Sequence, residues 1–149
     1  MFILDTDHIS LFQRRDPHVT ARALATSALE LATTVITVEE QLRGRLDRVR
    51  RARSDAEVVG AYRRLLATFF YFRTITIIDF DEQAQTIFQR LRAQRMRIGT
   101  LDLRIAAIAL SREATLVTRN RQDFAGISSL NIEDWSVPGD DVIGQRVSR

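Results

Sequence analysis

The 149-residue sequence contains no cysteine and no lysine, and it has only two prolines and six glycines. Without cysteine the chain cannot carry a disulfide framework, a zinc–thiolate site or a thiol nucleophile. It fits a reducing compartment, so we expect a cytoplasmic protein. No Pro-, Gly- or Ser-rich linker, internal repeat or low-complexity tract divides the chain. We therefore expect one domain over residues 1–149, with roughly the last ten residues as a flexible tail.

Long hydrophobic runs are also missing. The densest apolar patch, residues 65–72, is interrupted by Thr68 and falls well short of the roughly 18 to 20 residues that span a bilayer. The opening run, residues 1–4, is too short for a signal peptide and predicts a buried strand. We expect a protein without membrane contact.

Positive charge comes entirely from arginine, with 22 arginines against 19 acidic residues and a net charge of +3. Six arginines crowd one segment: Arg43, Arg45, Arg48, Arg50, Arg51 and Arg53. Because arginine binds phosphate through paired hydrogen bonds, such a face would position a nucleic-acid backbone without reading its sequence. An ordinary solvated helix face is the alternative explanation.

The order of apolar and polar segments predicts an α/β fold, with a mostly parallel sheet of about five strands and helices on both faces. Strands are expected at residues 2–4, 34–36, 74–77, 115–118 and 131–133. Helices are expected at residues 19–31, 38–53, 55–71, 82–95 and 101–113, with Ser54 or Asp55, Asp81 and Thr100 as capping residues of the last three.

The expected helix at residues 55–71 carries a thick apolar stripe, formed by Val58, Tyr62, Leu65, Leu66, Phe69 and Phe70. Such a stripe usually packs in the core. Its aromatic end, residues 69–72, is richer than a small domain needs, so we expect part of it to form a homodimer or partner interface.

Two acids follow the first strand. Asp5 lies at the carboxyl end of that strand, the edge where open α/β sheets bind ligands, and Asp7 can share this position. An aspartate here can also cap a helix through its free N–H groups. We favour a functional role for Asp5, while both roles stay open for Asp7.

Glu40 has two competing explanations. Thr37 and Glu40 have the spacing of a capping box, in which Glu40 would bond back to the Thr37 backbone. Against this, Gly44 lies one turn later, costs about 1 kcal/mol of helix propensity relative to alanine and leaves open space beside Glu40.

Asp102 begins a helix whose i+3, i+4 and i+7 neighbours are apolar, so its carboxylate shares the face that packs on the sheet. A charge there needs compensation, which a bound cation would supply. Asn120 and Asp123 lie where the strand at residues 115–118 ends, although either one alone is consistent with turn chemistry.

The ordered set of these motifs resembles the PIN-domain family, and within it the VapC-like toxins of toxin-antitoxin pairs, over nearly the full chain. The resemblance rests on Ile3-Leu4-Asp5-Thr6-Asp7, residues 36–44 around Glu40, Gly99-Thr100-Leu101-Asp102, and residues 116–124 followed by Ile132-Glu133-Asp134-Trp135.

The resemblance implies that Asp5, Glu40 and Asp102 form the acidic catalytic and metal-binding core. Glu39 is one residue off register and is expected to be a surface charge. Many relatives carry a fourth acid where this chain has Asn120, so either Asn120 or Asp123 completes the site. An all-oxygen ligand set favours Mg²⁺, or Mn²⁺, over zinc. His8 and His18 are expected to be bystanders, with His8 close to Asp7.

The implied function is that of a Mg²⁺-dependent endoribonuclease toxin, with RNA as substrate, a cognate antitoxin as partner and a homodimeric state. Two rivals remain. One is a haloacid-dehalogenase-like phosphohydrolase with Asp5 as nucleophile and Asp7 as acid/base, which would need a lysine that this chain lacks. The other is a non-catalytic binding module in which Asn120 marks a decayed site.

Overall fold

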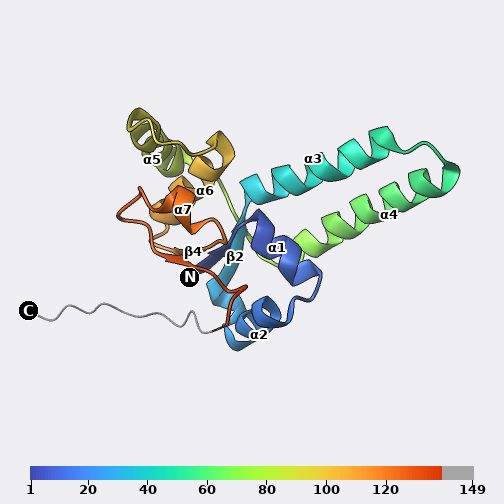
Figure 1. Cartoon of the computed structure of the whole chain (residues 1–149), viewed down its shortest axis with the longest axis horizontal. Coiled ribbons are helices and arrows are strands. Elements are labelled where there is room, and N and C mark those ends of the chain that lie inside the picture. Colours follow the sequence, from blue (N-terminus) through green and yellow to red (C-terminus); the bar gives the residue numbers. More distant parts are fainter. Residues whose placement is uncertain (139–149) are drawn as a thin grey trace, which may run out of the picture.

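A computed structural model describes residues 1–138 (Figure 1). The expected tail lies in residues 139–149, outside the described residues. Five parallel strands form one sheet in the order β3-β2-β1-β4-β5. The strands are β1 (Phe2–Leu4), β2 (Leu31–Thr34), β3 (Thr76–Ile78), β4 (Thr115–Val117) and β5 (Ile132–Glu133). The α/β fold with a five-stranded parallel sheet, expected from the sequence, is confirmed.

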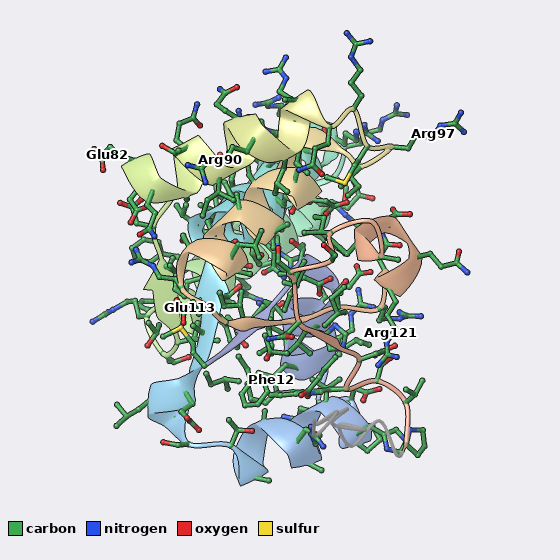
Figure 2. The ribbon with its side chains drawn as sticks, turned by 90° about the vertical axis from the view of Figure 1, so that its left-hand side faces the viewer. Phe12, Glu82, Arg90, Arg97, Glu113 and Arg121 are labelled. Atoms are coloured by element: carbon green, nitrogen blue, oxygen red, sulfur yellow. The ribbon has the colours of Figure 1, made fainter. Side chains whose placement is uncertain are left out.

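Helices cover both faces of this sheet, as Figure 2 shows from the side. They are α1 (Thr6–Gln13), α2 (Pro17–Ala25), a 3₁₀ turn at Ala28–Glu30, α3 (Val35–Arg51), α4 (Asp55–Phe72), α5 (Glu82–Ala93), α6 (Thr100–Ser111) and α7 (Arg121–Phe124). Side chains alternate along each strand. Ile3 and Leu116 pack in the cluster with α5 and α6, whereas Leu4 and Val117 pack with α1 and α2.

Helices α3 and α4 pack against each other as an antiparallel arm that projects from the body of the molecule (Figure 1). The base of the arm joins the core through Ile36 and Phe72, which are both buried. Its outer part is open to solvent along much of α4. Within residues 1–138 no helix is long and apolar enough to cross a membrane.

The exposed part of α4 bears on the expected interface. Phe69 and Phe70 are 58% and 50% exposed, and Tyr62 and Leu66 are exposed as well. Phe72 is only 6% exposed and belongs to the core, so assigning it to the expected interface was wrong. The apolar stripe is therefore divided between core and surface.

Several element boundaries differ from the expected ones. The strand expected at residues 34–36 ends at Thr34, because the Thr34 hydroxyl accepts a hydrogen bond from the Thr37 backbone N–H and begins α3. The helix expected at residues 19–31 is α2, which begins at Pro17 and ends at Ala25. Thr100 is inside α6 and does not cap it; Gly99 occupies the capping position without a side-chain bond.

Two predicted caps are confirmed. The Ser54 hydroxyl accepts from the Glu57 N–H at the start of α4, and the Asp81 carboxylate accepts from the Ala84 N–H at the start of α5. Local side-chain chemistry therefore located helix starts correctly where the capping residue stands outside the helix.

Candidate acidic site

The predicted site residues converge at the carboxyl ends of the central strands. From β1 the chain moves outward to β2 and β3, and then crosses back to place β4 on the other side of β1. This reversal is the point where open α/β sheets bind ligands. Asp5 follows β1, and Asn120 and Asp123 follow β4. Glu40 lies in α3, after β2, and Asp102 lies in the first turn of α6.

Asp102 shows that these acids share one electrostatic environment. Its carboxyl group is partly buried, and its pKa is raised to about 6. Burial is the largest cause, followed by four neighbouring carboxylates: Glu40, Asp5, Asp123 and Asp7. Among residues 1–138 no hydrogen-bond or ion-pair partner compensates the Asp102 carboxylate. The structure therefore accumulates negative charge at this position without neutralising it.

Glu40 points toward α1. The Thr6 hydroxyl donates a 2.8 Å hydrogen bond to Glu40 Oε1 and lies 3.3 Å from the Thr37 hydroxyl. Because α3 begins at Val35, Glu40 lies in its second turn and cannot form the capping box with Thr37. The capping explanation is wrong. Glu39 is exposed and pairs with Arg43, as expected for a surface charge.

Asp5 caps α1 and also faces the site. Its Oδ1 accepts a 2.8 Å bond from the His8 backbone N–H and lies 3.2 Å from His8 Nδ1. A capping carboxylate keeps lone pairs for a second partner, so the cap does not remove Asp5 from the site. Asp7 is not the cap; it is exposed in the first turn of α1.

His8 lies beside the candidate site residue Asp5. Its Nδ1 is 3.2 Å from Asp5 Oδ1, and its imidazole is completely buried. The Trp135 backbone N–H donates to His8 Nε2 at 3.2 Å, and Asp134 Oδ1 lies 3.3 Å from the same nitrogen. In the neutral imidazole Nδ1 therefore carries the hydrogen and donates it to Asp5. The i,i+3 spacing of Asp5 and His8 was the signal for this contact.

Replacing His8 with alanine should destabilise the fold. The change removes a fully buried ring and leaves the Asp5 and Asp134 carboxylates and the Trp135 N–H without their shared partner. We expect a loss of roughly 2–4 kcal/mol in the free energy of unfolding, measured by urea denaturation. His18→Ala, at an exposed position on α2, is the control and should change it by less than about 0.5 kcal/mol.

The fourth position of the site joins two residues. The Asn120 side-chain amide donates a 2.5 Å bond to Asp123 Oδ2, and the Asn120 backbone N–H donates to the Thr118 hydroxyl at 3.0 Å. Asp123 is exposed, whereas Asn120 is partly buried. The charge of Asp123 contributes to the raised pKa of Asp102, and either Asn120 or Asp123 can supply an oxygen to a ligand.

Oxygen donors of this kind suit a hard divalent cation. In residues 1–138, however, no group of three or more acidic or histidine side chains is arranged to hold a metal ion. Asp5, Glu40 and Asp123 each accept a hydrogen bond from a neighbouring donor. The donor chemistry fits a cation, and gathering the ligands requires rotation of side chains away from these donors.

Comparison with known proteins identifies the family. The PIN domain family model matches residues 2–129, and the chain belongs to the PIN-domain family. Its relatives are VapC proteins. The chain is 28% identical over 138 residues to the tRNA(fMet)-specific endonuclease VapC of Salmonella typhimurium, covering 90% of this chain and 97% of that protein.

Solved structures give the same assignment. DNA-bound VapBC from Salmonella typhimurium superposes with a TM-score of 0.72 at 28% identity and covers 90% of this chain and 97% of the other. VapBC2 from Rickettsia felis, bound to a promoter DNA fragment, gives 0.71 at 25% identity and covers 90% and 98%. The expected VapC-like membership is confirmed.

Proposed function

We propose that the protein is a Mg²⁺-dependent endoribonuclease that acts as the toxin of a toxin-antitoxin pair. The observation that carries the proposal is the uncompensated negative charge at Asp102, which lies at the ligand-binding edge of a PIN-domain fold. Such a charge is costly in a partly buried position unless a cation offsets it.

Asp5, Glu40 and Asp102 would hold the cation, with Asn120 or Asp123 completing the set. Bound Mg²⁺ lowers the pKa of a water ligand and stabilises charge that develops on a phosphodiester. Among the chain's own residues, Thr6 orients Glu40, while His8 fixes Asp5. Attack by water on the phosphorus, with cleavage of its bond to the 3′-oxygen, would leave a 5′-phosphate on one product and a 3′-hydroxyl on the other.

RNA and the antitoxin are supported by the relatives. The Salmonella relative is named for cleavage of tRNA(fMet), and the solved relatives are VapBC pairs. We extend these properties to this chain as a ribonuclease activity, an antitoxin partner, a homodimeric state and a cytoplasmic location. Which RNA is cut depends on shape and single-stranded loops that no motif here encodes.

The haloacid-dehalogenase-like alternative has little support. It requires Asp7 as acid/base beside Asp5, but Asp7 is exposed on α1, and the chain has no lysine. The non-catalytic alternative requires a decayed site. The chain retains Asp5, Glu40 and Asp102, and the neighbouring carboxylates help to raise the pKa of Asp102, which argues against decay.

A cleavage assay tests the proposal. End-labelled single-stranded RNA and DNA of the same sequence are incubated with purified protein in Mg²⁺, in Mn²⁺ and in EDTA. We expect RNA cleavage in either metal, none in EDTA, and loss of cleavage in Asp5→Asn. Cleavage that persists in EDTA, or in Asp5→Asn, would remove the metal site from the mechanism.

Glu40 and its neighbour provide a matched pair. Glu40→Gln keeps the shape and the Thr6 contact but removes the charge, so we expect at least a 100-fold loss of cleavage, on the order of a removed charge-stabilising group. Glu39→Gln changes only the exposed pair with Arg43 and should cleave at the wild-type rate. Equal rates in both variants would refute a role for Glu40.

A further inference from the structure

A groove lined by arginines lies between the α1–α2 connection and the arm. It has a volume of about 660 Å³. Four arginines line it: Arg14, Arg15, Arg45 and Arg64. Among residues 1–138, no aspartate or glutamate lines it. The lining also includes Thr20, together with Phe12 and Tyr71, whose rings give the groove an apolar wall. We call this the cationic groove.

The arginines of the cationic groove are not neutralised internally. Within residues 1–138, Arg14, Arg15 and Arg64 make no ion pair. Arg45 donates from Nε to the Thr68 hydroxyl at 2.9 Å, which leaves its two terminal nitrogens without a partner in this part of the chain. Burial first, and then the charges of Arg64, Arg48 and Arg14, lower the pKa of Arg45.

Two hydroxyl groups add to the unmet hydrogen-bonding capacity. Thr20 and Tyr71 line the cationic groove, and their hydroxyl oxygens are buried without a hydrogen-bond partner among the described residues. Burial raises the pKa of the Tyr71 hydroxyl to about 12. The guanidinium donors of the cationic groove suit an anionic oxygen ligand.

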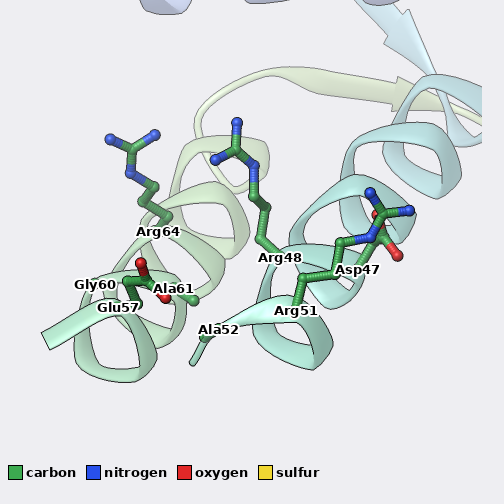
Figure 3. A pocket seen from close by; sticks show the side chains of 8 residues that line it. All are labelled: Asp47, Arg48, Arg51, Ala52, Glu57, Gly60, Ala61 and Arg64. Carbon is green, nitrogen blue, oxygen red and sulfur yellow. The ribbon is translucent and has the colours of Figure 1, made fainter. Parts of the chain in front are cut away.

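A second groove, farther out on the arm, differs in its charge balance (Figure 3). It has Asp47 and Glu57 in its lining, and Arg51 pairs with Asp47 at 3.1 Å. Figure 3 shows Arg48 and Arg64 extending to the same side of the arm, while Arg51 turns to Asp47. The arginine-rich segment predicted from sequence is therefore not one uniform face: some members are paired, and Arg45 lines the cationic groove.

The cationic groove adjoins the acidic site. Gln41, next to Glu40, bonds to Ser10 and Gln13, and both of these line the groove. Arg45 lies five residues beyond Glu40 on α3, about 7.5 Å along the helix. Carboxylates that gather at Asp102 repel a polyanion, so a nucleic acid bound there needs cations at its neighbouring phosphates.

We propose that the cationic groove binds two neighbouring backbone phosphates of an RNA strand, one at Arg45 and one at Arg64, and that the cleaved phosphate of the same strand lies at the acidic site. This inference rests on the proposed function. Arg45 and Arg64 supply the contacts, and the apolar wall of Phe12 and Tyr71 lies beside the bound strand.

RNA binding without cleavage tests this assignment. The anisotropy of a labelled single-stranded RNA is measured in EDTA over a series of salt concentrations. Each phosphate contact contributes about 0.7 to the slope of log K against log salt for a single strand. We expect Arg45→Gln and Arg64→Gln each to lower the slope by about 0.7, and Arg51→Gln and Arg90→Gln to leave it unchanged. Arg64 is exposed, so its variant folds even if Arg45→Gln loses stability with the Thr68 bond.

Wild-type slopes in both groove variants would overturn the assignment. A competition experiment can also overturn it. If poly-glutamate displaces RNA from the wild type at a lower concentration than inorganic phosphate or unlabelled RNA does, and does not displace it from Arg64→Gln, the groove prefers an acidic protein segment. Cleavage in Mg²⁺ by the wild type is measured in parallel. Cleavage with unchanged slopes in the groove variants refutes only the groove, whereas absence of cleavage refutes the proposed nuclease.

Discussion

Asp102→Asn should make the metal-free protein more stable at pH 7 while abolishing RNA cleavage. In the wild type a carboxylate is held in a partly buried position beside four other acids, and its pKa is raised to about 6. Asparagine has nearly the same shape and no charge. The variant therefore loses the electrostatic cost of Asp102 together with its proposed role in the site.

The pH dependence has a definite sign. An aspartate that titrates near 3.9 when unfolded and at about 6 when folded binds its proton more tightly in the folded state. The contribution of Asp102 to wild-type stability therefore falls as pH rises from about 4 to 6 and stays lower above that range. The advantage of Asp102→Asn should be absent below pH 4 and grow to on the order of 1–2 kcal/mol at pH 7.

Urea denaturation in EDTA at pH 4, 5, 6 and 7 measures this difference. Asp47→Asn, at an exposed carboxylate on the arm, is the control and should show no pH-dependent gain beyond about 0.5 kcal/mol. Adding Mg²⁺ should stabilise the wild type, by about 2.7 kcal/mol at 100 times its dissociation constant, and leave Asp102→Asn unchanged. The measured quantity is the unfolding free energy of Asp102→Asn minus that of the wild type. If this difference is smaller at pH 7 than at pH 4, the carboxylates around Asp102 do not destabilise its charged form.

The fold was predictable because its signals are local. Short apolar runs separated by helical patterns define a parallel sheet, and Ser54 and Asp81 mark helix starts through their own side chains. The run of β-branched residues from Thr33 to Val38 gave no such mark, since it suits a strand and a helix equally. There the hydroxyl of Thr34, bonded to the Thr37 N–H, decides where the strand ends.

The acids themselves were also accessible from sequence, but their partners were not. Asp5 and Asp102 were predicted as candidates from strand-end and helix-start positions, whereas Glu40 was selected through the family resemblance. Thr6 lies 34 positions from Glu40, and Trp135 lies 127 positions from His8, so only the folded chain brings these pairs together. The cationic groove could not be predicted from the sequence for the same reason, because its arginines come from three separate segments.

The exposed aromatics of α4 lead to the second large effect, which concerns assembly. Phe70 is half exposed, whereas Phe72 is buried in the core two residues later. Exposed apolar surface of this kind marks an interface, so we expect Phe70→Ser to convert a homodimer to a monomer in sedimentation velocity at micromolar concentration. The thermal midpoint of the dissociated subunit should be nearly unchanged, because Phe70 contributes little to the core.

Phe72→Ser should act in the opposite way. It removes a ring that packs with Tyr71 and the α1–α2 cluster, so we expect a loss of roughly 3–5 kcal/mol in the free energy of unfolding, measured by urea denaturation. The two variants separate interface from core on one helix. The wild type could instead sediment as a monomer at high micromolar concentration, with the same sedimentation coefficient as Phe70→Ser. That result would show that α4 carries no self-association surface, and the antitoxin would then be the partner expected at its exposed aromatics.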